Sequence, residues 1–232
     1  MAGKRLNHQN RHHHNWLIDR INDRFTRGNA QLYRGTLYDL GCGEASYRDF
    51  FLEYANRYIG VDWAESFHST RADIIADLNE PLPVDSEVAD TIVSLSVLEH
   101  LSQPQLMLVE ACRMLKPGGT ILCQVPWQWW IHEAPYDFFR YSPHGLQLMF
   151  REAGFVNVVL QPSAGFFTTI ALKWNYFSTR FLRGAFPVCW ALLAAILPLW
   201  CIGQWAAQLL DRVLDRNWSL EAPGYYVTAR KL

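Results

Sequence analysis

The sequence lacks a CxxC pair, an excess of charge of either sign and an apolar segment at its start. A formal net charge of −1 argues against a broad electrostatic surface for nucleic acid, so no nucleic-acid partner is expected. Without an apolar opening segment we expect no secretory signal and a cytoplasmic location. The cysteines are scattered through apolar runs and are expected as reduced core thiols in a reducing compartment: Cys42, Cys112, Cys123, Cys189 and Cys201.

Charged residues are also absent from 184–210. This span is long enough to cross a bilayer, which takes about 20 apolar residues. A single crossing would put the closing strand expected at 224–229 on the wrong side, so we expect two shorter helices that meet near Pro198. We favour monotopic contact with the inner face of the membrane through 184–210, because so apolar a patch is costly in water. A soluble cap, or the contact of a homodimer, is the alternative.

The remaining sequence predicts one α/β domain. The chain has 232 residues, 50% of them hydrophobic, and its strand-like and helix-like runs alternate from residue 36 onward. Among them we expect a helix at 47–54, a strand at 72–78, the fifth strand at 120–125, and a helix at 142–153 with Ser142 as N-cap and Pro143 at its first position. This order is typical of a Rossmann-like, doubly wound sheet. We divide the chain into an N-terminal arm and amphipathic helix (1–35), a core (36–165), a hydrophobic helical insert (166–223) and a closing strand of the core (224–232). The adjacent His12, His13 and His14 are interpreted as part of a solvated arm.

The chain is organised around a glycine turn in residues 37–46. Tyr38 and Leu40 indicate a buried strand, and Gly41 and Gly43 allow a sharp turn in which the backbone comes close to a ligand. A helix that follows would point its free N–H groups at that ligand. About twenty residues later a second strand ends at Asp62, where a carboxylate can accept hydrogen bonds from both hydroxyls of a ribose. Together they predict a nucleotide-containing cofactor.

Several motifs, taken in order, resemble class I S-adenosylmethionine-dependent methyltransferases of the small-molecule kind often called type 11. The glycine turn and the Asp62 strand are the first two, and Asp77 before 81–83 is similar to the family's adenine contact. The family usually has a third glycine where this chain has Ala45. The resemblance covers roughly residues 36–160 and a final strand, where the last strand would be the antiparallel one of seven. Further matching motifs lie at 97–101, 115–119 and 152–155.

The resemblance implies S-adenosyl-L-methionine as cofactor and gives roles to residues. Asp39 and the glycine turn would hold the methionine portion, Asp62 the ribose, and Asp77 the adenine amino group. Leu78 would pack on the adenine ring, and groups near Ser94 and Ser96 would line the pocket. The implied cofactor-binding set is Asp39, Gly41, Cys42, Gly43, Asp62, Trp63, Asp77, Leu78, Ser94 and Ser96.

A polar and aromatic run at 126–141 follows the fifth strand and is expected on the ligand-binding face. His132 is our first candidate for a general base and His100 our second, because an imidazole titrates near working pH. Both also have a structural interpretation. Glu133 and Asp137 could orient His132, and Arg140 could either grip an acidic acceptor or pair with Asp137. No metal is expected in this site.

We therefore predict a methyltransferase acting on a small or amphiphilic acceptor, such as a lipid-linked glycan. The run at 132–141 resembles a bacterial subgroup often linked to cell-surface polysaccharide and lipid metabolism. The alternatives are a soluble small-molecule O- or N-methyltransferase whose insert is a lid, and a degenerate module that binds cofactor without catalysis. A nicotinamide-dependent oxidoreductase is a more distant possibility, because the glycine turn alone does not exclude a dinucleotide.

Overall fold

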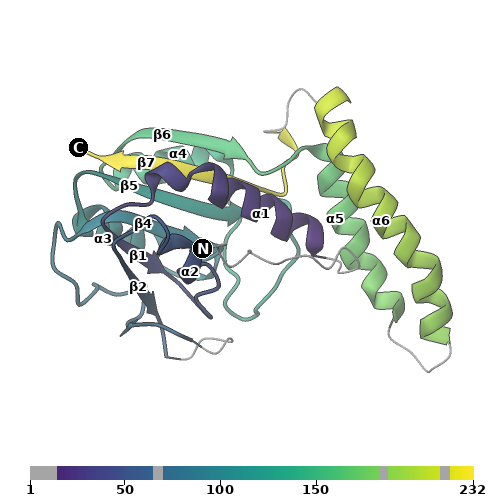
Figure 1. Ribbon diagram of the computed structural model, residues 1–232, viewed down its shortest axis with the longest axis horizontal. Helices are drawn as coiled ribbons and strands as arrows, with labels where there is room; N and C mark the ends of the chain where they lie inside the picture. The colour runs from purple at the N-terminus through teal and green to yellow at the C-terminus, as the bar shows by residue number, and fades with distance from the viewer. Residues whose placement is uncertain (1–14, 65–69, 183–187, 215–219) are drawn as a thin grey trace. The chain divides into compact units, whose positions relative to one another are not determined.

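The computed structural model describes residues 15–64, 70–182, 188–214 and 220–232. They form two compact units (Figure 1). The core unit comprises the described residues of 29–161 and 225–232, and the helical unit comprises those of 15–28 and 162–224. The N-terminal helix thus groups with the hydrophobic insert rather than with the sheet. The predicted domain boundaries, with their separate N-terminal region, stay a prediction.

The core unit is built on a seven-stranded sheet in the order β3-β2-β1-β4-β5-β7-β6. Pairing is parallel from β3 to β5, and β7 runs against its neighbours (Figure 1). This confirms the predicted Rossmann-like sheet with an antiparallel last strand. The strands are β1 (Thr36–Leu40), β2 (Arg57–Asp62), β3 (Ile74–Ile75), β4 (Ala89–Leu95), β5 (Leu115–Pro126), β6 (Phe155–Pro162) and β7 (Gly224–Lys231).

Burial along the strands shows which of them lie at the centre of the sheet. Four consecutive residues of β1 and five of β2 are buried, as expected for parallel strands covered on both faces. In β6, by contrast, exposure alternates from residue to residue, so one face of this edge strand meets solvent. The carboxyl ends of β1, β2 and β4 are therefore held in a rigid, well-packed sheet, which gives the side chains that follow them fixed positions.

Short helices connect these strands. They are η1 (Ala30–Leu32), α2 (Arg48–Phe51), η2 (Leu98–His100), α3 (Pro104–Met114) and α4 (Pro143–Glu152). The predicted start of α4 is confirmed: Ser142 is its N-cap, its Oγ accepts a hydrogen bond from the Gly145 N–H at 3.2 Å, and Pro143 opens the helix. Gly154, at φ +96°, follows the end of α4 in a left-handed conformation that suits glycine.

Three predicted elements have different bounds in the structure. The strand expected at 72–78 is only β3, because the Asp73 carboxylate accepts the Gly60 N–H at 2.8 Å and the Asp77 carboxylate accepts the Asn79 N–H. The helix expected at 47–54 is only α2. Strand β5 begins at Leu115 rather than Thr120, because its pairing with β4 shifts register there and takes up the intervening residues.

The helical unit contains α1 (Trp16–Gly28), α5 (Phe166–Ser178), η3 (Thr179–Leu182) and α6 (Val188–Leu214). The amphipathic α1 was predicted from its spacing, and Leu17, Ile21 and Phe25 are indeed buried. Helices α5 and α6 lie side by side (Figure 1). The prediction of two helices that meet near Pro198 is wrong, because α6 continues through this residue. The proline removes only one backbone hydrogen bond, and packing against α5 and η3 supports the helix.

Side-chain hydrogen bonds join α5 to α6. The Asp211 carboxylate of α6 accepts the N–H groups of Gly165, Phe167 and Thr168 at 3.1, 2.8 and 3.3 Å, which satisfies the open N-terminus of α5. Farther along the helix pair, the Trp200 indole N–H donates to the Ser178 hydroxyl at 2.7 Å. Asp211, although charged, is 1% exposed. The helix pair is therefore fixed by specific polar contacts as well as by apolar packing.

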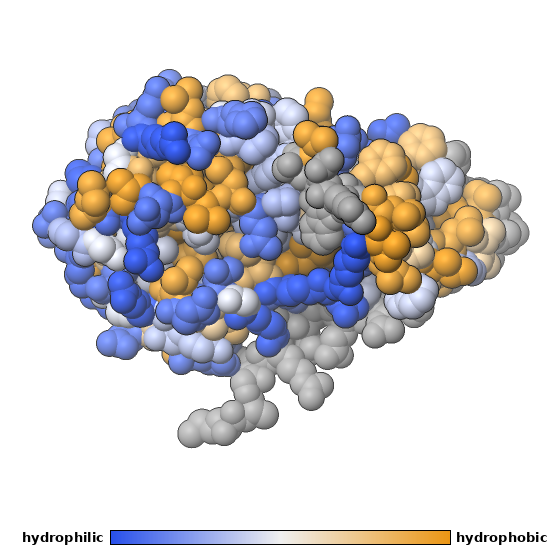
Figure 2. Space-filling model, turned by 90° about the horizontal axis from the view of Figure 1, so that it is seen from above, coloured by the Kyte–Doolittle hydropathy of each residue, from blue (hydrophilic) through white to orange (hydrophobic). Residues whose placement is uncertain are grey.

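Helix α6 is long and apolar enough over Leu192–Leu214 to cross a membrane, with a mean hydropathy of 1.5. Only 22% of its most apolar window is buried, whereas the core helix of a soluble protein would be mostly buried. Figure 2 shows hydrophobic side chains gathered over helices α5 and α6. Ile202 and Trp205 are 64% and 72% exposed.

Candidate functional site

A cavity of about 520 Å³ opens at the carboxyl ends of β1, β2 and β4, within the core unit. Its wall comes from the turns that follow β1, β2 and β3, from the segment after β4, and from the loop after β5. This is the edge at which parallel sheets bind ligands. The lining residues are Gly41, Gly43, Asp62, Trp63, Asp77, Leu78, Asn79, Leu95, Ser96, Val97, His100, Leu101, Ser102, Glu133, Tyr136 and Phe138.

The glycine turn has the geometry that the sequence predicted. Gly41 and Gly43 have φ angles of +78° and +50°, and a Cβ at Gly41 would meet Val97 Cγ2 at 2.3 Å. A side chain at Gly41 would therefore collide with the cavity wall. Ala45, where the resembled family usually has glycine, is left-handed with φ +53°. This explains why glycine suits that position and what conformational cost the alanine carries.

Asp62 ties the ends of β1 and β2 together. One of its carboxylate oxygens accepts the Gly43 N–H at 2.6 Å, and the other accepts the Trp63 N–H at 2.8 Å. Each carboxylate oxygen has a second lone pair, so the side chain can also accept hydrogen bonds from a ligand in the cavity that it lines. Asp62 thus holds the glycine turn in place and offers a charged acceptor to the same space.

The turn after β3 brings a second carboxylate to the cavity. Asp77 Oδ1 accepts hydrogen bonds from the backbone and side-chain N–H groups of Asn79 at 2.8 and 2.9 Å. Leu78, which is buried, adds an apolar surface to the wall beside it. Ser96 lines the cavity from the end of β4, and its hydroxyl donates to the Gln124 side-chain oxygen. The predicted adenine contacts therefore share one cavity with the predicted ribose contact.

Three predicted cofactor residues lie outside the lining of this cavity. Asp39 is buried and accepts a hydrogen bond from the Tyr58 hydroxyl at 2.7 Å, and burial raises the pKa of its carboxyl to about 7. Burial likewise raises the pKa of the Cys42 thiol to about 12. The Ser94 hydroxyl is buried and has no hydrogen-bond partner in the described part of the chain. Their roles stay predictions.

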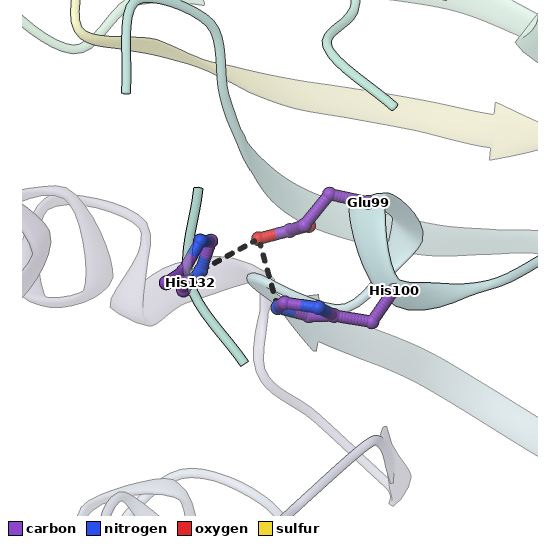
Figure 3. A group of neighbouring side chains, drawn as sticks. All are labelled: Glu99, His100 and His132. Carbon is purple, nitrogen blue, oxygen red and sulfur yellow. Dashed lines mark ion pairs between the residues drawn. The ribbon is translucent and has the colours of Figure 1, made fainter. Parts of the chain in front are cut away.

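At the other end of the cavity wall, Glu99 and His100 of η2 meet His132 of the loop after β5 (Figure 3). The Glu99 Oε1 atom lies 3.7 Å from His100 Nε2 and 4.0 Å from His132 Nε2. The two imidazole rings meet edge to face, with centroids 4.8 Å apart. Glu99 is 0% exposed, and burial raises the pKa of its carboxyl to about 8.

The second ring nitrogen of His100 has a hydrogen-bond partner, whereas that of His132 is buried without one among the described residues. His100 Nδ1 lies 2.6 Å from the Tyr136 carbonyl oxygen, which can only accept a hydrogen bond, so this nitrogen carries the proton. His132 Nδ1 lies 3.3 Å from Asp137 Oδ2. Burial and the neighbouring His100 lower the pKa of His132, which favours the neutral ring. With the proton on Nδ1, His100 presents the lone pair of Nε2 toward Glu99, and His132 Nε2 faces the same carboxylate.

Asp137 and Arg140 form the ion pair that was one of the two predicted alternatives. Both Asp137 oxygens accept hydrogen bonds from the Arg140 guanidinium, which also donates to the Trp130 carbonyl at 2.8 Å. Burial alone would raise the pKa of Asp137, but the hydrogen bonds from Arg140 and the His132 backbone outweigh it and hold this pKa at about 2. Arg140 does not line the cavity, so the geometry offers no support for a grip on an acidic acceptor.

The structure brings together residues for which the sequence predicted no role. Glu99 is the centre of the His100 and His132 group, and Tyr136 and Phe138 line the cavity. Glu133, which was expected to orient His132, lines the cavity as well. Glu99 stood in a motif of the resembled family, but its complete burial has no signature in the sequence. Of the two candidate bases, His100 lines the cavity and His132 does not.

Comparison with known proteins gives consistent relatives. A family model described as a methyltransferase domain matches residues 38–123. A probable S-adenosylmethionine-dependent methyltransferase of Mycolicibacterium smegmatis is 32% identical over 94 residues, which are 38% of this chain and 37% of that protein. A ubiquinone biosynthesis O-methyltransferase of Maricaulis maris is 27% identical over 120 residues, 47% of each chain. The chain thus spans less than half the length of these curated relatives.

Solved structures share the fold across most of the chain. A SAM-dependent methyltransferase of Archaeoglobus fulgidus superposes with a TM-score of 0.57 at 17% identity, covering 89% of this chain and 91% of its own. Phosphoethanolamine N-methyltransferase 2 of Haemonchus contortus, solved with S-adenosyl-L-methionine, gives 0.58 at 14% identity, covering 97% of this chain and 57% of its own. At such identities the likeness concerns the fold alone.

Proposed function

We propose that this chain, which carries a methyltransferase domain of the class I S-adenosylmethionine-dependent family, transfers the methyl group of S-adenosylmethionine to an acceptor. The observation that carries this proposal is one cavity lined by the glycine turn, Asp62 and Asp77, each at the end of a successive strand. This lining fits a nucleoside with a charged tail. The two glycines of the turn leave their backbone open to the ligand, one carboxylate faces the cavity, and a second carboxylate stands beside an apolar wall.

In this arrangement Asp62 would accept hydrogen bonds from the ribose hydroxyls, and Asp77 from the adenine amino group. Leu78 would pack on the adenine ring, and the backbone of Gly41 and Gly43 would lie against the methionine portion. The cofactor supplies a sulfonium, which is already a strong electrophile. The protein therefore has mainly to orient the acceptor and to exclude water.

The acceptor's polar group would lie near His100 and Glu133, which line the second half of the cavity wall. For a hydroxyl acceptor, an imidazole Nε2 that bears a lone pair is a suitable place for the proton. Geometry supports His100 ahead of His132 in that position, because His100 lines the cavity. His132, held by Asp137, would then act as a positioning residue behind it.

We propose further that the acceptor is amphiphilic and that the chain reaches it at a membrane surface. The support is the helical unit: helix α6 has no charged residue before Asp211, and apolar side chains of α5 and α6 are exposed together. Examples are Ile170, Trp174, Phe177, Leu199, Ile202 and Trp205. Some relatives are named as O-methyltransferases of ubiquinone biosynthesis, so an oxygen atom is one candidate for the atom that accepts the methyl group. The alternative is a water-soluble acceptor, with this surface serving as a lid or a homodimer contact.

The test is methyl transfer from S-adenosylmethionine labelled in the methyl group, with either a membrane-lipid extract or a water-soluble metabolite extract as acceptor. We expect label to enter the organic phase after extraction, and much less of it when Asp62→Ala is used. Label only in the aqueous phase would favour the soluble enzyme. A folded chain that binds the cofactor but transfers no label to either extract would favour the non-catalytic module.

Membrane contact is tested separately by sedimentation with phosphatidylethanolamine and phosphatidylglycerol vesicles. We expect the full chain to sediment with the vesicles, and Ile202→Lys and Trp205→Lys to reduce the bound fraction, since each puts a charge on the apolar surface. Val159→Lys is the matched control, because Val159 is an equally exposed apolar residue, 58%, on strand β6 of the core unit. Equal binding of all three variants, or none by the unmodified chain, would contradict membrane contact.

A further inference from the structure

We infer that Glu99, His100 and His132 bind a divalent transition-metal ion, with Glu133 in reach as a fourth ligand. The three side chains offer one carboxylate oxygen and two imidazole nitrogens, all within 4.8 Å of one another (Figure 3). The site stands on their positions alone and does not depend on the proposed methyl transfer.

The Glu99 side chain is completely buried, and neither of its carboxylate oxygens has a hydrogen-bond partner among the described residues. A buried carboxylate without a hydrogen-bond donor is costly, and the groups nearest to it are the Nε2 atoms of His100 and His132. A cation between these three groups would satisfy all of them.

The orientation of the two histidines also favours a bound metal ion. His100 Nδ1 faces the Tyr136 carbonyl oxygen, and His132 Nδ1 faces the Asp137 carboxylate, which Arg140 holds in turn. Ligating histidines usually donate their other ring N–H to a carbonyl or carboxylate, which fixes the ring and the tautomer, and His100 does so. His132 is held beside Asp137 by its backbone N–H, which donates to Asp137 Oδ2 at 2.8 Å. The two Nε2 lone pairs and the Glu99 lone pairs then converge, and lone pairs that face one another attract a cation.

The distances between the candidate ligand atoms are close to those of a single metal site. Ligand atoms bound to one ion at about 2.0–2.2 Å are separated from each other by roughly 3.0–3.5 Å. The observed separations from Glu99 Oε1 are 3.7 and 4.0 Å, so side-chain shifts of less than about 1 Å close the site. Glu133 Oε2 lies 3.9 Å from His100 Nε2, at the side of the group that borders the cavity.

Two imidazoles and a carboxylate suit zinc, cobalt, manganese or iron in the divalent state, and suit magnesium or calcium less, since these prefer oxygen ligands. His100 and Glu133 line the cavity, so a remaining coordination position would face it. An oxygen of the methyl acceptor could bind there, and the ion would lower the pKa of a hydroxyl that it binds. This use of the ion rests on the proposed function. With the ion bound it would replace proton transfer to His100 Nε2, because a nitrogen that ligates a metal has no free lone pair.

The test uses the full chain with His12, His13 and His14 replaced by serine, because an N-terminal histidine run could bind metal by itself. Cobalt(II) is titrated at constant pH without any cofactor, and visible absorption reports its coordination. We expect one ion per chain, displaced by zinc, with at least 100-fold weaker binding for Glu99→Gln and for His132→Ala. Asp137→Asn should weaken binding by roughly 10- to 100-fold, as an outer-shell change does.

His144→Ala is the control, because His144 is an exposed histidine on α4, and its cobalt affinity should stay unchanged. If Glu99→Gln fails to fold, His132→Ala decides, since its side chain comes from a partly exposed loop position. A folded chain without cobalt binding, or equal affinity in His132→Ala, overturns the inference. Intact binding of S-adenosylhomocysteine in that same sample would leave the proposed function standing.

Discussion

Replacing Asp62 by alanine separates the binding role of this carboxylate from its structural role. The side chain accepts two backbone N–H groups, from Gly43 and Trp63, and lines the cavity. A hydrogen bond to a charged group contributes about 1.5–3 kcal/mol. Loss of one such bond to a ribose hydroxyl corresponds to a roughly 10- to 150-fold rise in the dissociation constant for S-adenosylhomocysteine.

The same change also affects the fold. Both N–H groups border the cavity, where water can replace the carboxylate, so we expect a loss of only about 1–3 kcal/mol in the free energy of unfolding. Asp73→Ala is the matched control. Asp73 likewise accepts a backbone N–H of strand β2, from Gly60 at 2.8 Å, but it does not line the cavity. It should lower stability comparably and leave cofactor affinity within about twofold.

The assays are calorimetric titration with S-adenosylhomocysteine and denaturant unfolding of the same samples. A dissociation constant for Asp62→Ala within twofold of the unmodified chain would refute the ribose role. An equal loss of affinity in Asp73→Ala would also refute the reasoning, because it would mean that the change acts through the packing of β2 and not through a contact with the ligand.

Gly41→Ala should destabilise the fold by several kcal/mol in denaturant unfolding, because the added Cβ would collide with Val97. Gly43→Ala should cost only about 1–2 kcal/mol, because no atom lies within 4 Å of its added Cβ. Equal losses of stability in the two variants would contradict the clash. Asp211→Ala should cost about 1–3 kcal/mol and speed hydrogen exchange at the start of α5, and unchanged exchange there would argue against the cap. The pKa of Asp39 is about 7 in the fold, so between pH 4 and 7 the folded state keeps a proton that the unfolded state has lost, and stability falls as pH rises. Asp39→Asn should therefore gain more stability at pH 7.5 than at pH 4.5 in thermal unfolding, and an equal change at both pH values would contradict the raised pKa.

Much of the core unit was predictable from sequence because its signals are local. The glycine turn, the acid at the end of β2 and the capped start of α4 each lie within a few residues, and backbone sterics or a cap decide them. The order of strands and helices then predicts a parallel sheet, and its carboxyl edge predicts the place of the cavity.

What could not be predicted depends on contacts between distant segments. Glu99 meets His132 only because the one-turn helix η2 and the loop after β5 come together beside the cavity, and nothing in either segment alone shows this. The complete burial of Glu99 also arises from that packing. The prediction of two helices that meet near Pro198 was wrong for the same reason. The helix-breaking propensity of proline is a local rule, and the packing of α6 on α5 overrides it.

The most direct test of the account is calorimetric titration of the unmodified full chain with S-adenosylmethionine and S-adenosylhomocysteine, with and without detergent. The account predicts binding of both ligands at one site per chain, with no competition from NAD. A folded chain that binds neither ligand, or one from which NAD displaces S-adenosylhomocysteine, would contradict the claim that this cavity is a methyltransferase cofactor site.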